Sequence, residues 1–447
     1  MAQYSLTQVR STCFWLCGSL ICLLVNGMMM IIVKRDKVQF ALLQLLFGLC
    51  AIAFGCVVVA PNLSAKVLSV AGITALVIFL LDIKNIKKND AFWLCLILLV
   101  IGICDLTWYR MYKVESAAIN SYRAYLEAGK ICVFGAFSIF VFANKNQLKV
   151  GSNKIHMLLI IALQVMIVIY AGYQHLFMDS KRVTLALTGG TDATGAAYTV
   201  AFISFYTILV LQHSKTRWKE LFILGHFFIT FLVLVTTETR AAILVYPIIF
   251  FGLLVVKLYK EKHIPWKGVT VFLIALLAGA FMMKDNLVKR YDDLNRDIVA
   301  FDKDNSRTSV GARFAMWETG LAASKNNYFW QSTDERNAKI VEEVKRDPSL
   351  SGALEHMRGH LHNEIVETLS VKGPSGVILY ILFVISLGWY ALRKLKSIIL
   401  CAFLVSLIMF GLSGVMFYSK TTPVAWMLTL IMSVVFLEQN KHRDIIK

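Results

Sequence analysis

The sequence predicts an all-α polytopic membrane protein. Apolar residues make up 57% of its 447 residues, whereas soluble domains contain about 45–50%. The apolar residues gather in runs of roughly 17–23 residues, and an α-helix of that length crosses a hydrocarbon core about 30 Å thick. Helices satisfy their backbone hydrogen bonds within the segment, as a lipid environment requires. A β-barrel would show short alternating segments instead, and the sequence contains none.

Thirteen apolar runs are candidate transmembrane helices. No small-residue cleavage site follows the first run, only Lys34-Arg35-Asp36-Lys37, so we expect it to be a retained helix and not a signal peptide. If that run does not span the membrane, twelve helices remain. The candidate spans are 13–33, 39–60, 65–83, 91–109, 124–143, 155–173, 195–212, 220–237, 240–257, 268–283, 374–392, 398–418 and 424–438.

The net charge of +18 predicts an orientation in the membrane and not a nucleic-acid partner, because the basic residues stand at the ends of apolar runs. Alternate loops differ in their basic content, and the richer set is expected in the cytoplasm. The poorer set contains Lys66, Arg110/Lys113/Arg123, Lys181/Arg182 and Lys420. The richer set contains Lys34/Arg35/Lys37, Lys84/Lys87/Lys88, Lys145/Lys149/Lys154, Lys215/Arg217/Lys219, Lys257/Lys260/Lys262/Lys267 and Arg393/Lys394/Lys396.

One long polar loop interrupts the helices, and the orientation of its neighbours places it outside the cytoplasm. We expect a single membrane domain made of N-terminal helices in 1–283, a loop subdomain in 284–372 and C-terminal helices in 373–447. Within the loop, 310–323 and 335–345 look helical. The first of these carries Phe314, Trp317 and Leu321 on one stripe at helical spacing, which suits a helix lying along the membrane surface.

The nine cysteines all fall inside apolar runs, and none has the spacing of metal ligands. We therefore expect small apolar side chains packed in helices, with no disulfide and no metal site.

Two arginines on the outer side are candidates for binding an anion. Arg240 lies between two spans, where it serves either as a membrane anchor or partner of Glu238, or as a phosphate ligand, since guanidinium grips phosphate with a bidentate fork. Arg313 stands at the start of a predicted helix, whose free N–H groups also favour anions. The alternative for Arg313 is an ordinary solvated charge.

The densest polar cluster is His360-Leu361-His362-Asn363-Glu364-Ile365-Val366-Glu367, just before Gly373-Pro374. It does not match the HExxH zinc pattern. On a helix the two histidines would point to different sides, while Asn363 and Glu367 would share a face. A histidine with carboxylates near it at a membrane surface suits a general base, and a polar helix cap is the alternative.

Further polar residues lie inside or beside the spans. Asp105 is one, and Lys130 is another, although Lys130 is spaced to pair with Glu127. The small-residue segment Thr194-Gly195-Ala196-Ala197-Tyr198 runs from an outer loop into a span, where it either packs tightly or admits a substrate.

Taken in order, these segments resemble the O-antigen ligases of enteric bacteria, within the wider family of O-antigen ligases and polymerases. The similar stretches run over about residues 95–380. They include Asp105-Leu106 with Trp108-Tyr109, Tyr122 to Phe137, Ala193 to Tyr198, Thr239-Arg240-Ala241, Gly311-Ala312-Arg313 and His360 to Glu364.

The resemblance implies a GT-C-like fold and a glycosyltransferase at the periplasmic face of the bacterial inner membrane. The donor would be O-antigen polysaccharide on undecaprenyl diphosphate and the acceptor the lipid A-core oligosaccharide, giving lipopolysaccharide without metal or cofactor and with anomeric inversion. His362 would be the base, assisted by Glu364 or Glu367, and Arg240 and Arg313 would hold the diphosphate. His360, Asn363, Lys130 and Asp105 would be supporting residues.

Two alternatives stay open at this point. An O-antigen polymerase would use the same lipid-linked donor with a different acceptor. A lipid or polysaccharide transporter would also combine many helices with buried charges, although no inverted repeat is visible and the polar cluster lies to one side of the membrane.

Overall fold

The computed structural model describes residues 35–81, 90–144, 153–178, 182–187, 193–261, 266–282, 284–325, 327–357, 359–419 and 421–446. Within these ranges the chain forms helices and loops, with no strand. The all-α polytopic fold expected from the sequence is confirmed. The first candidate span, 13–33, lies outside the described residues.

Each of the other twelve candidate spans coincides with a helix of the described chain. Ten helical segments are long and apolar enough to cross a membrane, while α10 and α16 are shorter, with 17 and 14 residues. The helices are α2 Arg35–Cys56, α3 Pro61–Leu81, α4 Phe92–Tyr112, α5 Ile119–Asn144, α6 Asn153–Phe177, α7 Ala193–Gln212, α8 Lys219–Thr236, α9 Arg240–Glu261, α10 Trp266–Met282, α15 Glu364–Trp389, α16 Ile398–Gly411 and α17 Thr422–Ile446.

The centre of the bundle is formed by helices that are distant in sequence. In the apolar stretch of α17 every residue is buried, and in that of α7 94% of the residues are buried. Helix α17 packs on α5, α7 and α2. In the apolar stretch of α6 only 28% of the residues are buried, as expected for a helix at the lipid surface. The core therefore consists of a few enclosed helices within a ring of lipid-facing ones.

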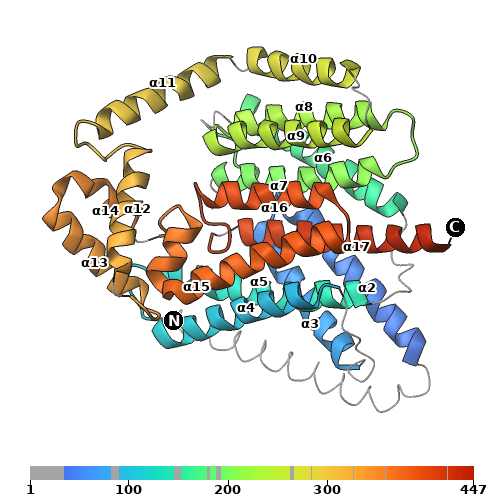
Figure 1. Ribbon diagram of the computed structural model, residues 1–447, viewed down its shortest axis with the longest axis horizontal. Coiled ribbons are helices and arrows are strands. Elements are labelled where there is room, and N and C mark those ends of the chain that lie inside the picture. Colours follow the sequence, from blue (N-terminus) through green and yellow to red (C-terminus); the bar gives the residue numbers. More distant parts are fainter. Residues whose placement is uncertain are drawn as a thin grey trace, which may run out of the picture.

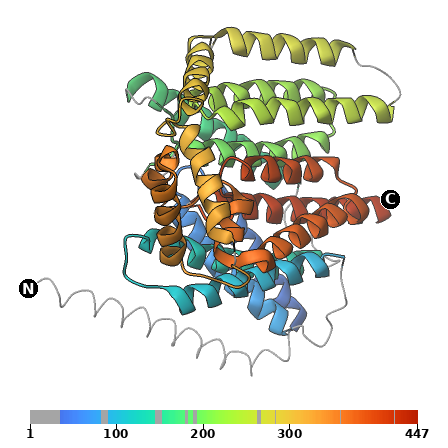
Figure 2. The ribbon, with the colours of Figure 1, turned by 60° about the vertical axis from the view of Figure 1, so that its left-hand side comes forward.

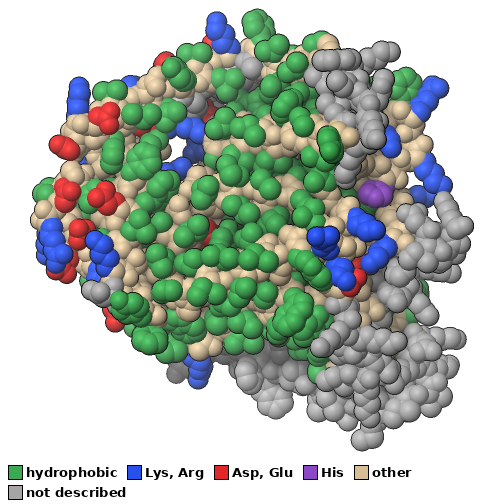
Figure 3. Space-filling view, in the orientation of Figure 1, with side chains coloured by type: hydrophobic (Ala, Val, Ile, Leu, Met, Phe, Trp, Pro, Cys, Tyr) green, Lys and Arg blue, Asp and Glu red, His purple; other side chains and the backbone are tan. Residues whose placement is uncertain are grey.

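The transmembrane helices run across the molecule side by side (Figure 1), and charged side chains separate to the two ends of this bundle. In Figure 3 apolar side chains cover the middle of one face, while acidic and basic side chains gather at its left and right edges. At one end, Asp90 is paired with Lys394 at 2.7 Å and Lys257 with Glu220 at 2.5 Å. This is the end where the described members of the richer basic set lie.

At the opposite end, the long polar segment folds into its own small group of helices. These are α11 Lys284–Phe301, α12 Gly311–Ser324, α13 Thr333–Arg346, the 3₁₀ turn η3 Pro348–Gly352 and α14 Ala353–His356. Both helices predicted within the loop are present as α12 and α13, and α11 is an additional one. Met316, Ile340 and Leu350 form part of a separate apolar core beneath them. Figure 2, turned by 60°, shows this group beside the ends of the transmembrane helices.

Aromatic residues of α4 and α5 hold the segment between α12 and α13 against the bundle. The Trp108 indole donates to the carbonyl of Gln331 at 2.9 Å, and the Tyr112 hydroxyl donates to that of Trp330 at 2.8 Å. The Tyr122 hydroxyl donates to the carboxylate of Asp334 at 2.7 Å. These bonds fix the polar helices to the membrane bundle.

Helix α15 begins at Glu364, ten residues before the predicted span, and contains a kink. Gly373 has φ 63°, so the helical path breaks there and resumes through Pro374. A Cβ at Gly373 would lie 2.9 Å from the backbone oxygen of Asn327, so this close approach requires glycine. The first two turns of α15 thus stand at a different angle from its membrane portion and carry the carboxylates of the polar cluster.

Candidate active site

A cavity of about 300 Å³ opens at the end of the bundle where the polar helices lie. Four parts of the chain enclose it: the start of α5, the start of α7, the turn before α15 and the loop between α16 and α17. The small residues Thr194 and Gly195 line one wall with Tyr198, so the segment that was ambiguous in sequence borders the cavity. The other lining residues include Asn120, Ser121, His360, His362, Met416, Tyr418 and Thr422.

The two histidines lie in a turn and not on a helix, so the helical spacing considered from the sequence does not apply to them. Both line the cavity, and their ring centroids are 4.6 Å apart in an edge-to-face arrangement. His362 adopts φ 50°, a left-handed conformation that is uncommon for a residue other than glycine. Such backbone geometry persists only where the surroundings hold it.

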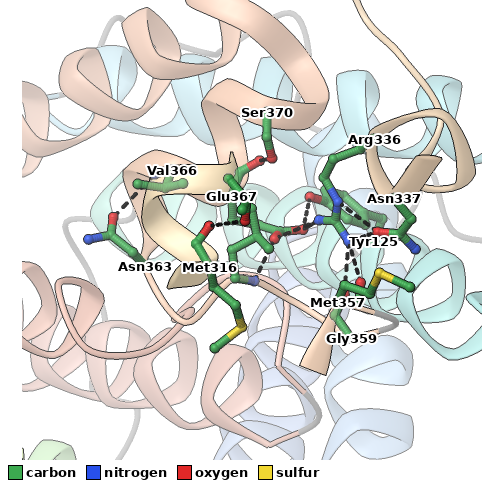
Figure 4. Close-up of polar contacts among 12 residues, drawn as sticks. Tyr125, Met316, Arg336, Asn337, Met357, Gly359, Asn363, Val366, Glu367 and Ser370 are labelled. Atoms are coloured by element: carbon green, nitrogen blue, oxygen red, sulfur yellow. Dashed lines mark hydrogen bonds and ion pairs between the residues drawn. The ribbon is translucent and has the colours of Figure 1, made fainter. Parts of the chain in front are cut away.

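Glu367 provides that support from the first turn of α15 (Figure 4). One oxygen of its carboxylate accepts the backbone N–H of Leu361 at 2.9 Å. The Arg336 guanidinium donates to both carboxylate oxygens at 2.9 and 2.8 Å, and the Tyr125 hydroxyl donates at 2.8 Å. Arg336 and Glu367 are both fully buried. Glu367 therefore fixes the residue directly before His362.

Arg336 holds the same turn a second time. Its other guanidinium nitrogen donates to the backbone carbonyls of Met357 at 2.9 Å and Gly359 at 3.3 Å. The turn that carries both histidines is thus fastened by one buried ion pair, at Met357 and Gly359 by Arg336 and at Leu361 by Glu367. Figure 4 shows the contacts of Arg336 with Met357 and Gly359. Asn363 caps α15 by accepting the N–H groups of Ile365 and Val366, which confirms the helix-cap alternative for this one residue.

Glu364 holds the opposite wall of the cavity. Its carboxylate accepts the backbone N–H groups of Met416 at 2.5 Å and Phe417 at 3.1 Å, within the loop between α16 and α17. The Asn363 amide donates to the carbonyl of Leu412 at 3.3 Å, near the start of the same loop. The cluster thus joins two walls: Glu367 secures the histidine turn, and Glu364 secures the loop facing it.

A buried cation lies behind this loop. Lys372 is ion-paired with Asp105 from α4, and its ammonium also donates to the Tyr418 hydroxyl at 2.8 Å. Burial raises the pKa of Tyr418 well above its usual 10.0, so its hydroxyl stays protonated at neutral pH. Since that oxygen already accepts from Lys372, its own proton can be donated toward the cavity. Asp105 is therefore joined to the cavity through Lys372 and Tyr418.

The remaining sequence-predicted residues lie outside the lining of this cavity. Arg240 begins α9 and pairs with Asp297 of α11 at 3.1 Å, with 27% of its side chain exposed. Arg313 lies in the first turn of α12, half-buried, and makes no side-chain hydrogen bond or ion pair within the described chain. Lys130 pairs with Glu127 at 2.8 Å, as its spacing predicted.

Arg240 is nonetheless connected to the rim of the cavity. The hydroxyl of its neighbour Thr239 donates to the carbonyl of Ala193, which directly precedes the lining residues Thr194 and Gly195. In Figure 3 the surface is hollowed between α11, α12 and the bundle, and basic side chains gather at the edge of that hollow.

Arg336 was not identified from the sequence. It shares the buried stripe of α13 with Ile340 and Val344, at positions i, i+4 and i+8. A charged residue in register with an apolar stripe predicts a buried partner, and this signal could have found it. Among the described residues, no three His, Cys, Asp or Glu side chains are grouped as a metal site.

Comparison with known proteins gives three findings. Residues 225–381 match the family model described as O-antigen ligase, a range that includes Arg240, Arg313, Arg336 and the polar cluster. The chain is 29% identical to the O-antigen ligase of Escherichia coli (strain K12) over 381 residues, covering 84% of this chain and 89% of that protein. An uncharacterized protein of Haemophilus influenzae is 32% identical over 145 residues, covering 31% of this chain and 36% of that protein. The resemblance stated from the sequence is confirmed.

Proposed function

We propose that this chain, a multi-pass membrane homologue of the O-antigen ligases, transfers O-antigen polysaccharide from undecaprenyl diphosphate to the lipid A-core oligosaccharide. The observation that carries the proposal is the placement of His362, which is held in a strained turn at the wall of a cavity bounded by helix ends. A group held in one orientation beside a cavity is what general-base catalysis requires.

In the proposed reaction His362 accepts the proton of an acceptor sugar hydroxyl. The oxygen attacks the anomeric carbon of the donor sugar, the new glycosidic bond forms, and the bond to the diphosphate breaks. The diphosphate leaves with the electron pair. A single displacement of this kind inverts the anomeric configuration. Glu364 and Glu367 act as positioning residues, since their carboxylates are already bonded to the backbone of the two cavity walls.

The leaving diphosphate gains negative charge as the bond breaks, and we propose that Arg240 and Arg313 neutralise it. Preorganised cations aimed at developing charge are among the largest contributions to catalysis. The half-buried Arg313 is available to a ligand, and Arg240 stands one residue from the bond that ties α9 to the cavity rim. In this proposal Asp297 occupies the position of the diphosphate until the donor displaces it.

We propose that the cavity opens to the periplasm of the bacterial inner membrane. The described basic loops gather at the opposite end of the bundle, where Lys394, Lys441 and Lys257 lie. The excess of positive charge on the cytoplasmic side of membrane proteins then assigns the cavity end to the other side.

Reconstitution with both substrates tests the function. The purified chain in detergent should join O-antigen from undecaprenyl diphosphate to lipid A-core oligosaccharide, with product formation followed by gel mobility and mass spectrometry. Since no membrane separates two compartments in detergent, a transporter would give no product. Formation of a longer lipid-linked polymer without use of the core acceptor would indicate a polymerase instead.

The proposed reaction needs no metal ion, and this is tested separately. Activity should persist after exhaustive treatment with EDTA and dialysis. A loss that is restored by one divalent cation would contradict the role given to the arginines.

A further inference from the structure

A second cavity lies at the membrane surface, at the end of the bundle remote from His362. It has a volume of about 400 Å³ and is lined by α6, α7 and α8, mainly through apolar side chains such as Ile160, Leu211 and Phe222. Large neighbouring side chains on this face are exposed, including Ile161 at 52% and Leu221 at 53%. Because the outer surface of these spans faces hydrocarbon, this groove is open to lipid.

Two polar atoms in this apolar groove lack a hydrogen-bond partner. The side chain of His226 is buried, with the residue only 7% exposed, and its Nδ1 atom has no hydrogen-bond partner. The Nε2 atom of Gln164 is in the same situation. Both residues line the groove. An unpaired polar group is costly in hydrocarbon, so these atoms indicate a ligand that brings polar atoms of its own.

The chemistry of the missing partner follows from the network behind His226. Its Nε2 atom lies 2.8 Å from the Ser204 hydroxyl, which lies 2.7 Å from the hydroxyl of Tyr246. We assign Ser204 as the donor to Nε2, which leaves the Nδ1–H of a neutral imidazole as a donor. The Gln164 amide nitrogen is a donor as well. Two donors among apolar side chains suit an acceptor such as the ester carbonyl of a lipid.

The depth of these atoms is consistent with that partner. His226 is seven residues beyond Lys219, the first residue of α8, so it lies roughly 10 Å along the helix axis. The headgroup region of a bilayer is about 5–8 Å thick on each side. The His226 donor is therefore placed where the ester groups and first methylenes of a phospholipid lie, and Gln164 lines the same groove.

Four basic residues lie on the chain segments that border the groove. Lys154 precedes the lining residue Met157 by one turn, and Lys219 precedes Phe222 in the same way. Lys215 and Arg217 stand in the loop between the lining residues Leu211 and Leu221. None of the four forms an ion pair within the described part of the chain. The nearby acidic residue, Glu220, is already paired with Lys257.

We infer that this groove binds an anionic glycerophospholipid, with its phosphate on the four cations, its ester carbonyls on Gln164 and His226, and its acyl chain along α6 and α8. Charge complementarity selects the headgroup, since basic residues at a membrane surface each favour anionic lipid about fivefold. The site is independent of the proposed transferase reaction, because it lies at the other end of the bundle from the cavity of His362.

Lipid titration of the purified full chain, followed by native mass spectrometry, tests this site. The probes are phosphatidylglycerol and phosphatidylethanolamine with identical acyl chains. Phosphatidylglycerol should bind at least tenfold more tightly. In the double variant Lys215→Glu/Arg217→Glu this preference should disappear, whereas Lys66→Glu/Arg110→Glu, which makes the same charge change at exposed positions near the other end, should retain it.

A second pair of variants tests the groove itself. Gly225 lines it, and a Cβ there meets no atom within 4 Å, so Gly225→Phe introduces an aromatic ring at the groove from a backbone position that has room for a side chain. Gly172 of α6 is equally unobstructed but does not line the groove, so Gly172→Phe is the matched control. Gly225→Phe should lower the affinity for both lipids at least tenfold while the melting temperature matches that of the control.

Equal affinity of the native chain for the two lipids would overturn the inference, as would unchanged binding in both Gly225→Phe and the charge-reversed variant.

Discussion

The Arg336 guanidinium and the Glu367 carboxylate form a fully buried ion pair between α13 and α15. This pair fastens the polar helices to the bundle and also fixes the turn that carries His362. Removing one partner of a buried pair leaves an uncompensated charge, which costs about 3–5 kcal/mol. We therefore expect Arg336→Ala and Glu367→Ala each to lower the free energy of unfolding by that amount, measured by chemical denaturation in detergent.

The conservative variant Glu367→Gln separates positioning from folding. Leu361 and Tyr125 donate to different oxygens of the carboxylate. Glutamine has a single carbonyl oxygen, so it keeps one of these two bonds and loses the charge that matches Arg336. We expect kcat to fall at least tenfold with little change in KM, because the substrate still binds while the base is displaced. A fall in melting temperature without any change in kcat would contradict the positioning role.

His362→Asn is the sharpest test of the proposed base. Asparagine tolerates the left-handed conformation that His362 adopts at φ 50°, so the turn should persist while the base is lost. We expect transfer to fall by about two to four orders of magnitude, with the melting temperature unchanged. His360→Asn in the same turn serves as the control and should retain far more activity than His362→Asn.

The two arginines are expected to act through the geometry of their guanidinium groups. Arg240→Lys and Arg313→Lys keep the charge but lose the bidentate fork, so both should recover little of the activity lost in the alanine variants. Kinetic assays of the purified variants measure this. Full activity of both alanine variants would contradict the proposal that these two arginines bind the diphosphate.

A variant of Asp297 tests whether the donor diphosphate competes with this carboxylate for Arg240. If the donor displaces its carboxylate from Arg240, Asp297→Asn should bind the lipid diphosphate more tightly, because the competing charge is gone. A binding titration with undecaprenyl diphosphate measures this, with Asp293→Asn on the same helix as the control. Weaker binding in Asp297→Asn would show that the ion pair builds the site and does not occlude it.

Gly373 is expected to tolerate no side chain. Its φ of 63° costs an L-residue about 1–2 kcal/mol, and a Cβ would press on the Asn327 oxygen at 2.9 Å. Gly373→Ala should therefore lower the melting temperature, whereas Gly172→Ala, in a helix with open space, should leave it unchanged or raise it. Differential scanning fluorimetry of both variants makes the comparison.

A deletion strain distinguishes the proposed ligase from a polymerase in the cell. Loss of a ligase should leave lipid A-core without O-antigen, while undecaprenyl-linked polymer accumulates. Loss of a polymerase should leave core that carries a single repeat unit. Gel electrophoresis of lipopolysaccharide separates these outcomes, and complementation with His362→Asn should fail to restore the native pattern.

Local sequence patterns were sufficient for the membrane helices and for α12 and α13, because apolar run length and helical periodicity depend on neighbouring residues. The same patterns could not place the histidine pair, since the conformation of His362 depends on Glu367 and on Arg336, which is 26 positions earlier in the chain. The partner of Arg240 on α11 and that of Asp105 on α15 were likewise invisible, because long-range packing selects them.

The complete burial of α17 has a consequence for how the molecule is made. In chain order α17 follows all the other described helices, yet its apolar stretch lies at the centre of the bundle. The helices from α2 to α16 are therefore synthesised before the helix that covers their central surfaces. Assembly of the bundle is therefore complete only after α17 has been synthesised, so a chain that ends before residue 422 would lack the helix on which α5, α7 and α2 pack.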